Sequence, residues 1–170
     1  MDNNGIKQRL DAYIAENFLE EKKIPANDAY KCYESFAFGG SHFCRKINFD
    51  KIFEKNKDET FSEKMTRLVE ESGEKNSVIY KRAQIDRQLF SRIKKNKDYQ
   101  PSKDTAVALA LALKLNLSKA KDFLASAGYA LTNSSKRDVI ISFFLENEIF
   151  DTDLLNDYLY EYKQPVLFGR

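Results

Sequence analysis

The sequence predicts an all-α protein, on three observations. The 170 residues include only 6 glycines and 3 prolines, the two residue types that interrupt helices most strongly. Apolar residues recur with helical spacing in most segments, and Ser, Asp or Gly stands where such a segment would begin or end. Hydrophobic residues make up 42% of the chain, which is enough for a folded core. We expect about seven helices and no sheet.

Residues 1–59 form the first of three predicted segments. Residues 5–21 predict an amphipathic helix, because their apolar side chains follow the 3.6-residue period; these are Ile6, Leu10, Tyr13, Ile14 and Phe18. Pro25 prevents the helix from continuing. Residues 26–48 lose this periodicity and predict an irregular connector rich in aromatic residues, and residues 49–56 predict a short helix.

Cys32, His42 and Cys44 lie in the connector and raise two chemical alternatives, a metal site or a Cys/His nucleophile. A structural zinc ion takes four ligands, usually in short paired spacings, whereas these residues are irregularly spaced and lack a fourth ligand. A catalytic pair would need orienting and oxyanion partners, which the sequence does not offer. We therefore expect no metal site, no cofactor and no enzymatic activity, and interpret these three as residues buried or half-buried in a loop.

The second segment, residues 60–129, opens with a helix that begins near Thr60 or Ser62. Its apolar stripe consists of Phe61, Met65, Leu68 and Val69. Gly73 can adopt the left-handed conformation that commonly follows a helix, so we expect the helix to end there.

Two short helices are predicted next, separated by a turn at Gln84-Ile85. The first, residues 76–83, places Val78, Ile79 and Ala83 on its buried side. Asp86 is a suitable N-cap for the second, residues 87–95, because its carboxylate can accept from the free N–H groups of the first turn. The second helix buries Leu89, Phe90 and Ile93, and it leaves outside the polar side chains of Arg87, Gln88, Ser91, Arg92, Lys94 and Lys95.

The following helices supply the expected centre of the fold. A polar loop ends at Pro101 and Ser102, and Ser102 is an N-cap candidate for an apolar helix over residues 105–115. That helix is apolar almost all round, which is typical of a helix buried on every side. A fifth helix over residues 118–127, capped by Ser118, turns Ala120, Phe123, Leu124 and Ala127 inward and ends at Gly128.

These five parts, in this order, resemble the Xre/Cro/C1-type helix-turn-helix (repressor-like) family. The resemblance rests on Ile85-Asp86, Phe90-Ser91-Arg92-Ile93, Pro101-Ser102 and Leu109-Ala110-Leu111-Ala112-Leu113. It implies a five-helix domain that places the helix over residues 86–95 in the major groove of double-stranded DNA. Two positions depart from the family pattern: Tyr80 replaces a small residue where the two helices cross, and Gln84 replaces glycine at the turn.

The resemblance and the basic side chains together give a predicted DNA-binding set. Its members are Arg87, Gln88, Ser91, Arg92, Lys94, Lys95 and Lys97.

The third segment, residues 130–170, predicts two further helices. Residues 139–145 are too apolar to be exposed on more than one side, and Asp151 can cap a last helix holding Leu154, Leu155, Tyr158, Leu159 and Tyr162. Two interpretations remain open: the pair enlarges the core, or it forms the surface for a homodimer or a protein partner.

Charge is unevenly distributed although the net charge is only +2. Eight basic residues and two acidic residues lie between Lys81 and Lys103, whereas seven acidic residues and no Lys or Arg lie between Asp138 and Glu161. The basic stretch suits a polyanion, and the acidic stretch should face away from it. No membrane-spanning run and no leader-like N-terminus are evident, and two cysteines do not make a disulfide framework, so we expect a cytoplasmic protein without membrane partners.

Three functional hypotheses follow. The first is a DNA-binding regulator of transcription that reads the major groove. The alternative is a protein-interaction module that kept the repressor fold and lost DNA binding, a reading favoured by Tyr80, Gln84 and the acidic C-terminal region. An enzyme using the cysteines with His42 ranks third. RNA is a weaker candidate than duplex DNA, because no aromatic platform accompanies the basic helix.

Overall fold

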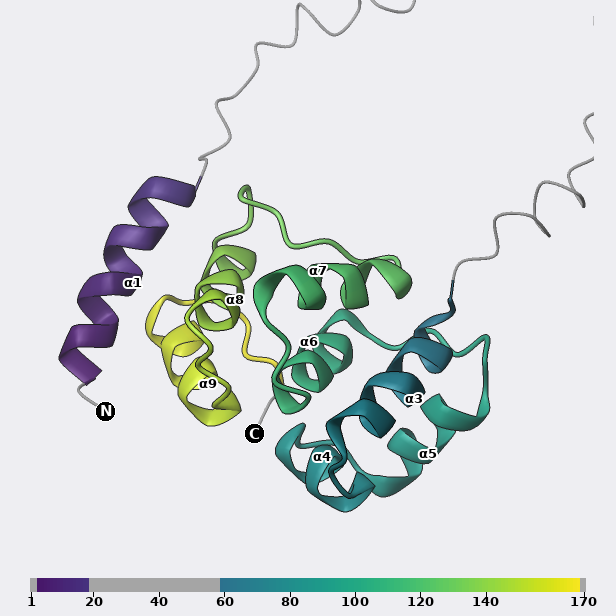
Figure 1. The fold of residues 1–170 in the computed structure, drawn as a ribbon. Coiled ribbons are helices and arrows are strands. Elements are labelled where there is room, and N and C mark those ends of the chain that lie inside the picture. The colour runs from purple at the N-terminus through teal and green to yellow at the C-terminus, as the bar shows by residue number, and fades with distance from the viewer. Residues whose placement is uncertain (1–2, 19–58, 169–170) are drawn as a thin grey trace, which may run out of the picture. The chain divides into compact units, whose positions relative to one another are not determined.

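The computed structural model describes residues 3–18 and 59–168, and within these ranges it contains eight helices and no strand. The prediction of an all-α protein is confirmed for this part of the chain (Figure 1). The helices are α1 (Asn3–Asn17), α3 (Phe61–Ser72), α4 (Asn76–Arg82), α5 (Arg87–Lys95), α6 (Lys103–Ala112), α7 (Leu117–Ser126), α8 (Lys136–Glu146) and α9 (Thr152–Glu161). The predicted connector, its Cys32, His42 and Cys44, and the predicted helix over residues 49–56 lie outside the described residues.

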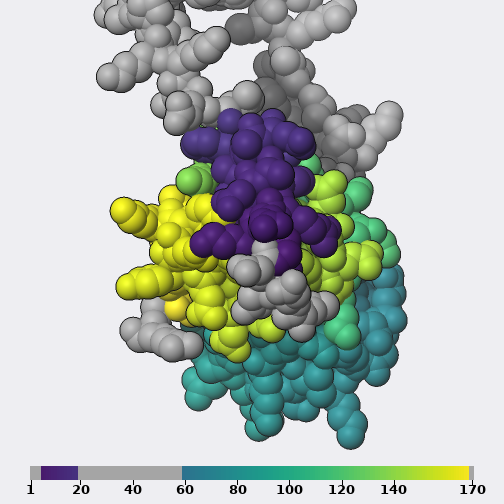
Figure 2. All heavy atoms as spheres, turned by 90° about the vertical axis from the view of Figure 1, so that its left-hand side faces the viewer, coloured from purple at the N-terminus to yellow at the C-terminus, as the bar shows by residue number. Residues whose placement is uncertain are grey.

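Helix α1 packs on the C-terminal helices, and Figure 2 shows it lying across their face. Ile6, Leu10 and Ile14 are buried, as their spacing predicted. The Tyr13 ring meets the Phe143 ring of α8 edge-on, with 5.3 Å between centroids, and its hydroxyl donates to Glu146 at 2.6 Å. The helix ends at Asn17, whereas the sequence predicted a helix up to residue 21, and residues 19–21 are not described.

Helix α3 begins and ends at residues that stabilise helix termini. The Thr60 hydroxyl accepts from the Glu63 N–H, and the Glu63 carboxylate accepts in turn from the Thr60 N–H, so the two residues form a capping box. Gly73 ends the helix with φ 64°, as predicted. Phe61, Met65 and Val69 are buried as predicted, but Leu68 is only half-buried, because it lies at the edge of this face.

Helix α6 is the centre of the core, as the sequence predicted. Every residue from 106 to 112 is fully buried, and Leu113 is 9% exposed. The helix is shorter than the predicted range 105–115: it begins at Lys103 after its N-cap Ser102 and ends at Ala112, and Lys114 takes a left-handed φ of 54°. It packs against α4 on one side and α7 on another.

The N-cap of helix α7 lies two residues earlier than predicted. Asn116, not Ser118, is its N-cap: the Asn116 backbone is extended, and its side chain accepts from the Lys119 N–H at 3.0 Å. Ser118 already lies within the first turn. The inward residues are those predicted, and the Phe123 ring packs on the Phe61 ring with 4.6 Å between centroids.

Helix α8 enlarges the core, which confirms the first interpretation of the C-terminal pair for this helix. Its residues 138–145 are all buried, between α1, α7 and α9. Asp151 caps α9, as predicted, and α9 buries Leu155, Tyr158 and Leu159 while its other side faces solvent. The helices of residues 3–18 and 59–168 lack the length and apolar character that crossing a bilayer requires.

Candidate nucleic-acid interface

Helices α4 and α5 are joined by a connection over residues 83–86. Ile79 and Ala83 are fully buried, as predicted, and α4 packs on α6. The prediction that Val78 is buried was wrong, since it is 42% exposed. Successive helical residues point about 100° apart, so α4 cannot turn both Val78 and the Ile79/Ala83 pair toward α6.

One residue of the connection, Gln84, has a left-handed backbone conformation although it is not glycine. Gln84 has φ 55°, a conformation that costs an ordinary residue roughly 1 kcal/mol or more. Two hydrogen bonds hold it there: the Ile85 N–H donates to the Tyr80 carbonyl at 3.0 Å, and the Gln84 side-chain amide donates to Asp153 of α9 at 2.8 Å. The C-terminal helix therefore braces the connection between α4 and α5.

Tyr80 is accommodated between the two helices. Its ring lies 5.9 Å from the Phe90 ring, in a tilted arrangement, and it is half-buried. A bulky residue at this position thus forms part of the α4–α5 contact.

Helix α5 is held on its inner side and at both ends. The Asp86 carboxylate accepts from the Leu89 N–H at 2.7 Å and caps the helix, as predicted. Phe90 and Ile93 are buried, and the buried Ser62 hydroxyl of α3 donates to the Ile93 carbonyl at 2.6 Å. Leu89 was predicted to be buried but is half-buried, because it lies between the inner side and solvent.

The outer side of α5 gathers most of the predicted DNA-binding residues. We call this surface the α5 outer face; a shallow hollow on it is lined by Arg87, Gln88, Ser91, Arg92 and Lys95. These positions share one side of a helix, being i, i+1, i+4, i+5 and i+8. Ser91 is half-buried and the other four are exposed.

The basic side chains of this face have no internal partner. Within residues 3–18 and 59–168, neither the two arginines, Arg87 and Arg92, nor the two lysines, Lys94 and Lys95, make an ion pair or a side-chain hydrogen bond. Lys94 lies beside the hollow and is half-buried. The face therefore presents four positive charges that no described carboxylate neutralises.

Other basic residues of the same stretch are engaged inside the fold. Arg82 donates to the Ala112 carbonyl at 2.6 Å and pairs with Glu74 at 2.9 Å. Lys103 pairs with the buried carboxylate of Asp138 at 2.7 Å. These two side chains stabilise the ends of α6 and are not available to a ligand.

Lys97, the last predicted DNA-binding residue, is paired as well. Its ammonium lies 2.7 Å from the Glu63 carboxylate, and both side chains are exposed. The hydrogen bond from Lys97, together with those from Thr60, lowers the pKa of Glu63 to about 2. Glu63 therefore competes with a phosphate for the Lys97 ammonium. The sequence reasoning missed the capping box, although Thr60 and Glu63 have its spacing.

The sequence reasoning also missed a groove on α9, described below, although Asp153, Asn156, Asp157 and Tyr160 follow one helix side at i, i+3, i+4 and i+7. In the described ranges, no group of three or more His, Cys, Asp or Glu side chains is placed to hold a metal ion.

Comparisons with known proteins add no relative: no protein-family model matches the sequence, and neither the curated proteins nor the solved structures include a significant match.

Proposed function

We propose that this protein binds double-stranded DNA by placing α5 in the major groove, and that it regulates transcription in this way. The observation that supports the proposal is the α5 outer face, where four cations without an ion pair and two polar side chains lie on one side of a capped helix, either exposed or half-buried. Polyanion binding draws most of its affinity from such cations. The resemblance to repressor-like domains supplies the orientation of α5.

The N-terminal turn of α5 would read bases. Arg87 and Gln88 are exposed there, and in repressor-like domains this end of the helix points into the groove. Arginine can pair bidentately with guanine and glutamine with adenine, each discriminating by about 1–3 kcal/mol. Ser91 and Arg92 lie one turn further along the same face, within reach of the next base edges or the flanking phosphates.

The C-terminal turn of α5 would bind the phosphate backbone. Lys94 and Lys95 have no described partner, so they can neutralise phosphates without losing an internal ion pair. Lys97 would contribute less, because Glu63 competes for its ammonium.

A protein-interaction module is the second candidate function. Tyr80 and Gln84 depart from the family pattern in sequence, but the Tyr80 ring fits beside Phe90 and Gln84 adopts the left-handed conformation. The observation that favours this candidate is the exposed side of α9, where Asp153 and Asp157 make no ion pair among the described residues.

Fluorescence anisotropy with a labelled random-sequence duplex of about 20 base pairs would test the proposal, because it measures affinity over a range of salt concentrations. We expect binding at low salt, with log K falling against log salt at a slope of about −3 to −4 if about four phosphates are neutralised. Lys121→Ala is a matched control, since Lys121 is exposed on α7 and lies outside the α5 outer face.

Two results would count against DNA binding. One is a folded wild type that binds no duplex at low salt, which would favour the interaction module. The other is an equal loss of affinity in Lys95→Ala and Lys121→Ala, which would indicate attraction to the whole protein and not to α5.

A further inference from the structure

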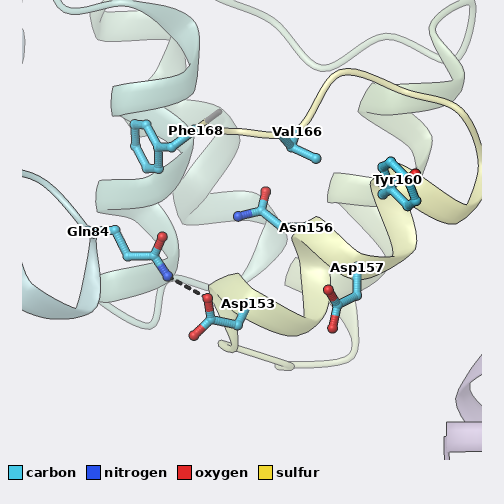
Figure 3. Close-up of a pocket in the computed structure, with 7 residues that line it drawn as sticks. All are labelled: Gln84, Asp153, Asn156, Asp157, Tyr160, Val166 and Phe168. Carbon is cyan, nitrogen blue, oxygen red and sulfur yellow. Dashed lines mark hydrogen bonds between the residues drawn. The ribbon is translucent and has the colours of Figure 1, made fainter. Parts of the chain in front are cut away.

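A second surface feature adjoins the connection between α4 and α5, which contributes Gln84 to it. It is a groove of about 400 Å³ lined by seven residues, and we call it the α9 groove (Figure 3). Helix α9, the connection between α4 and α5, and the C-terminal segment each contribute to its lining. These residues are Gln84, Asp153, Asn156, Asp157, Tyr160, Val166 and Phe168.

The C-terminal wall of the groove is fixed in place. The Leu167 N–H donates to the Asn156 side-chain carbonyl at 2.9 Å, and the Leu167 side chain is buried. Arg137 of α8 donates to the Pro165 carbonyl at 2.8 Å. Because these contacts hold the segment on α8 and α9, Val166 and Phe168 are positioned as a preformed apolar wall.

An exposed aromatic residue stands at the rim of the groove. Tyr160 is 79% exposed. Among the described residues, the other exposed large hydrophobic residue is Val78. Tyrosine is enriched at protein interfaces, because it combines a large apolar area with a polar tip and few rotatable bonds. A small ligand seated inside the groove would leave most of this ring uncovered, whereas a peptide segment could cover it.

The groove is negatively charged. Asp153 and Asp157 lie one turn apart on α9, and no basic side chain of the described residues pairs with either one. Asp153 accepts a hydrogen bond from the neutral amide of Gln84 and makes no ion pair among the described residues, although Lys81 and Arg82 line a neighbouring hollow with it. By contrast, Asp138 of α8 pairs with Lys103, and Glu161 of α9 pairs with Lys7.

We propose that the α9 groove docks an arginine-bearing segment of a partner protein. The guanidinium would lie between Asp153 and Asp157, and an apolar neighbour in the segment would pack on Tyr160 and Phe168. Arginine suits this groove better than lysine, because its planar fork offers several donors at once, is weakly hydrated and stacks on aromatic rings. The inference narrows the predicted C-terminal partner surface to one side of α9 and does not depend on DNA binding, since its charge is opposite to that of the α5 outer face.

An NMR titration of the isotopically labelled full chain tests the proposal. The probe is an acetylated and amidated five-residue peptide with a central arginine flanked by leucines. Its control is the same peptide with citrulline, which keeps the shape of arginine and lacks the charge. We expect saturable shifts at groove residues with the arginine peptide, and affinity weaker by roughly tenfold or more with citrulline, as for loss of a hydrogen bond between charged groups.

Protein variants give the second arm of the experiment. Asp157→Asn should weaken binding of the arginine peptide by a similar factor, and Tyr160→Ala should weaken it while the amide shifts of buried residues stay unchanged. Glu70→Gln is the matched control, since it removes the same charge from an exposed position on α3 outside the groove.

Three outcomes would overturn the inference. Equal affinity for the arginine and citrulline peptides would show that the groove does not recognise the positive charge of arginine. Equal weakening by Asp157→Asn and Glu70→Gln would indicate non-specific attraction. Arginine amide binding as tightly as the peptide would identify a small-molecule site in place of a protein-docking groove.

Discussion

Helices α5 and α6 are neighbours in the chain and of similar length, yet they use their surfaces in opposite ways. Helix α6 is buried on every side from Thr105 to Ala112, whereas α5 buries only Phe90 and Ile93. Substitutions in α6 should therefore change the stability of the whole fold, while substitutions on the α5 outer face should leave the fold intact and change binding.

The basic stretch between Lys81 and Lys103 shows the same division. Arg82 and Lys103 are paired at the two ends of α6 and belong to its structure. Lys97 is exposed but paired with Glu63, and the cations of α5 are unpaired within the described ranges. A run of like charges in a sequence thus combines structural and ligand-accessible residues, and pairing distinguishes them.

The largest effect is expected where α6 meets α8. Lys103→Met would leave the Asp138 carboxylate, 4% exposed, without its cation, and removing one partner of a buried pair costs about 3–5 kcal/mol. Chemical denaturation would measure this. Adding Asp138→Asn should recover part of the loss, because a neutral amide needs no counter-ion; a loss below about 1 kcal/mol in the single variant would show that the pair is not structural.

Shortening a buried side chain in the middle of α6 should lower the free energy of unfolding by a comparable amount. Leu109 is fully buried, so Leu109→Ala would remove buried methyl groups and leave a cavity, at a cost of about 2–5 kcal/mol. The matched variant on the other helix is Gln88→Ala, at an exposed position, which should change the free energy of unfolding by less than about 0.5 kcal/mol. Similar losses for both variants would contradict the contrast between α5 and α6.

On α5, the expected effect moves from stability to sequence preference. Arg87→Ala should reduce discrimination between the preferred and a mismatched duplex by about 1–3 kcal/mol, since a bidentate contact to a base would be lost. Selection of preferred duplexes from a random pool, followed by anisotropy, would measure this. Unchanged discrimination with unchanged affinity would show that Arg87 does not face the bases.

A smaller loss of affinity, equal for all sequences, is expected at Lys95, two turns further along α5. Lys95→Ala should weaken binding to all duplexes alike and reduce the magnitude of the salt slope by about 1, because one phosphate contact is removed. Circular dichroism should show an unchanged fold. A loss confined to one sequence would instead assign Lys95 to base reading.

The smallest effect is expected at Lys97, the residue of the basic stretch that pairs with Glu63. The folded pKa of Glu63, about 2, lies below its ordinary value of 4.5, so its stabilising contribution is complete above pH 4.5 and is lost as the pH falls toward 2. Lys97→Ala should raise the pKa of Glu63, because the hydrogen bond from Lys97 is the main cause of its lowering. Titration of the side-chain carboxyl carbon by NMR would measure the change, and an unchanged pKa would show that the Thr60 capping box is sufficient.

Local sequence signals determined much of this fold. The caps Asp86, Ser102 and Asp151 were predictable because each precedes an apolar helical pattern and its side chain reaches only the next turn. Helix α6 was predictable because a helix that is apolar on all sides must be buried. The polar side of α5 followed in the same way from the position of its apolar residues.

Tertiary packing decided what local pattern could not. Val78 is exposed because α6 contacts only one side of α4, and Lys97 is neutralised by Glu63, which lies 34 residues away in the sequence. Gln84 keeps a left-handed backbone with the help of Asp153, 69 residues further along, and the α9 groove exists because Leu167 and Arg137 hold the C-terminal segment against α8 and α9. The sequence by itself determined the helices, their caps and the basic side of α5, since these depend on residues within a turn or two. Only the tertiary structure decided which charges stay unpaired, because an ion pair depends on distance in space and not on separation along the chain.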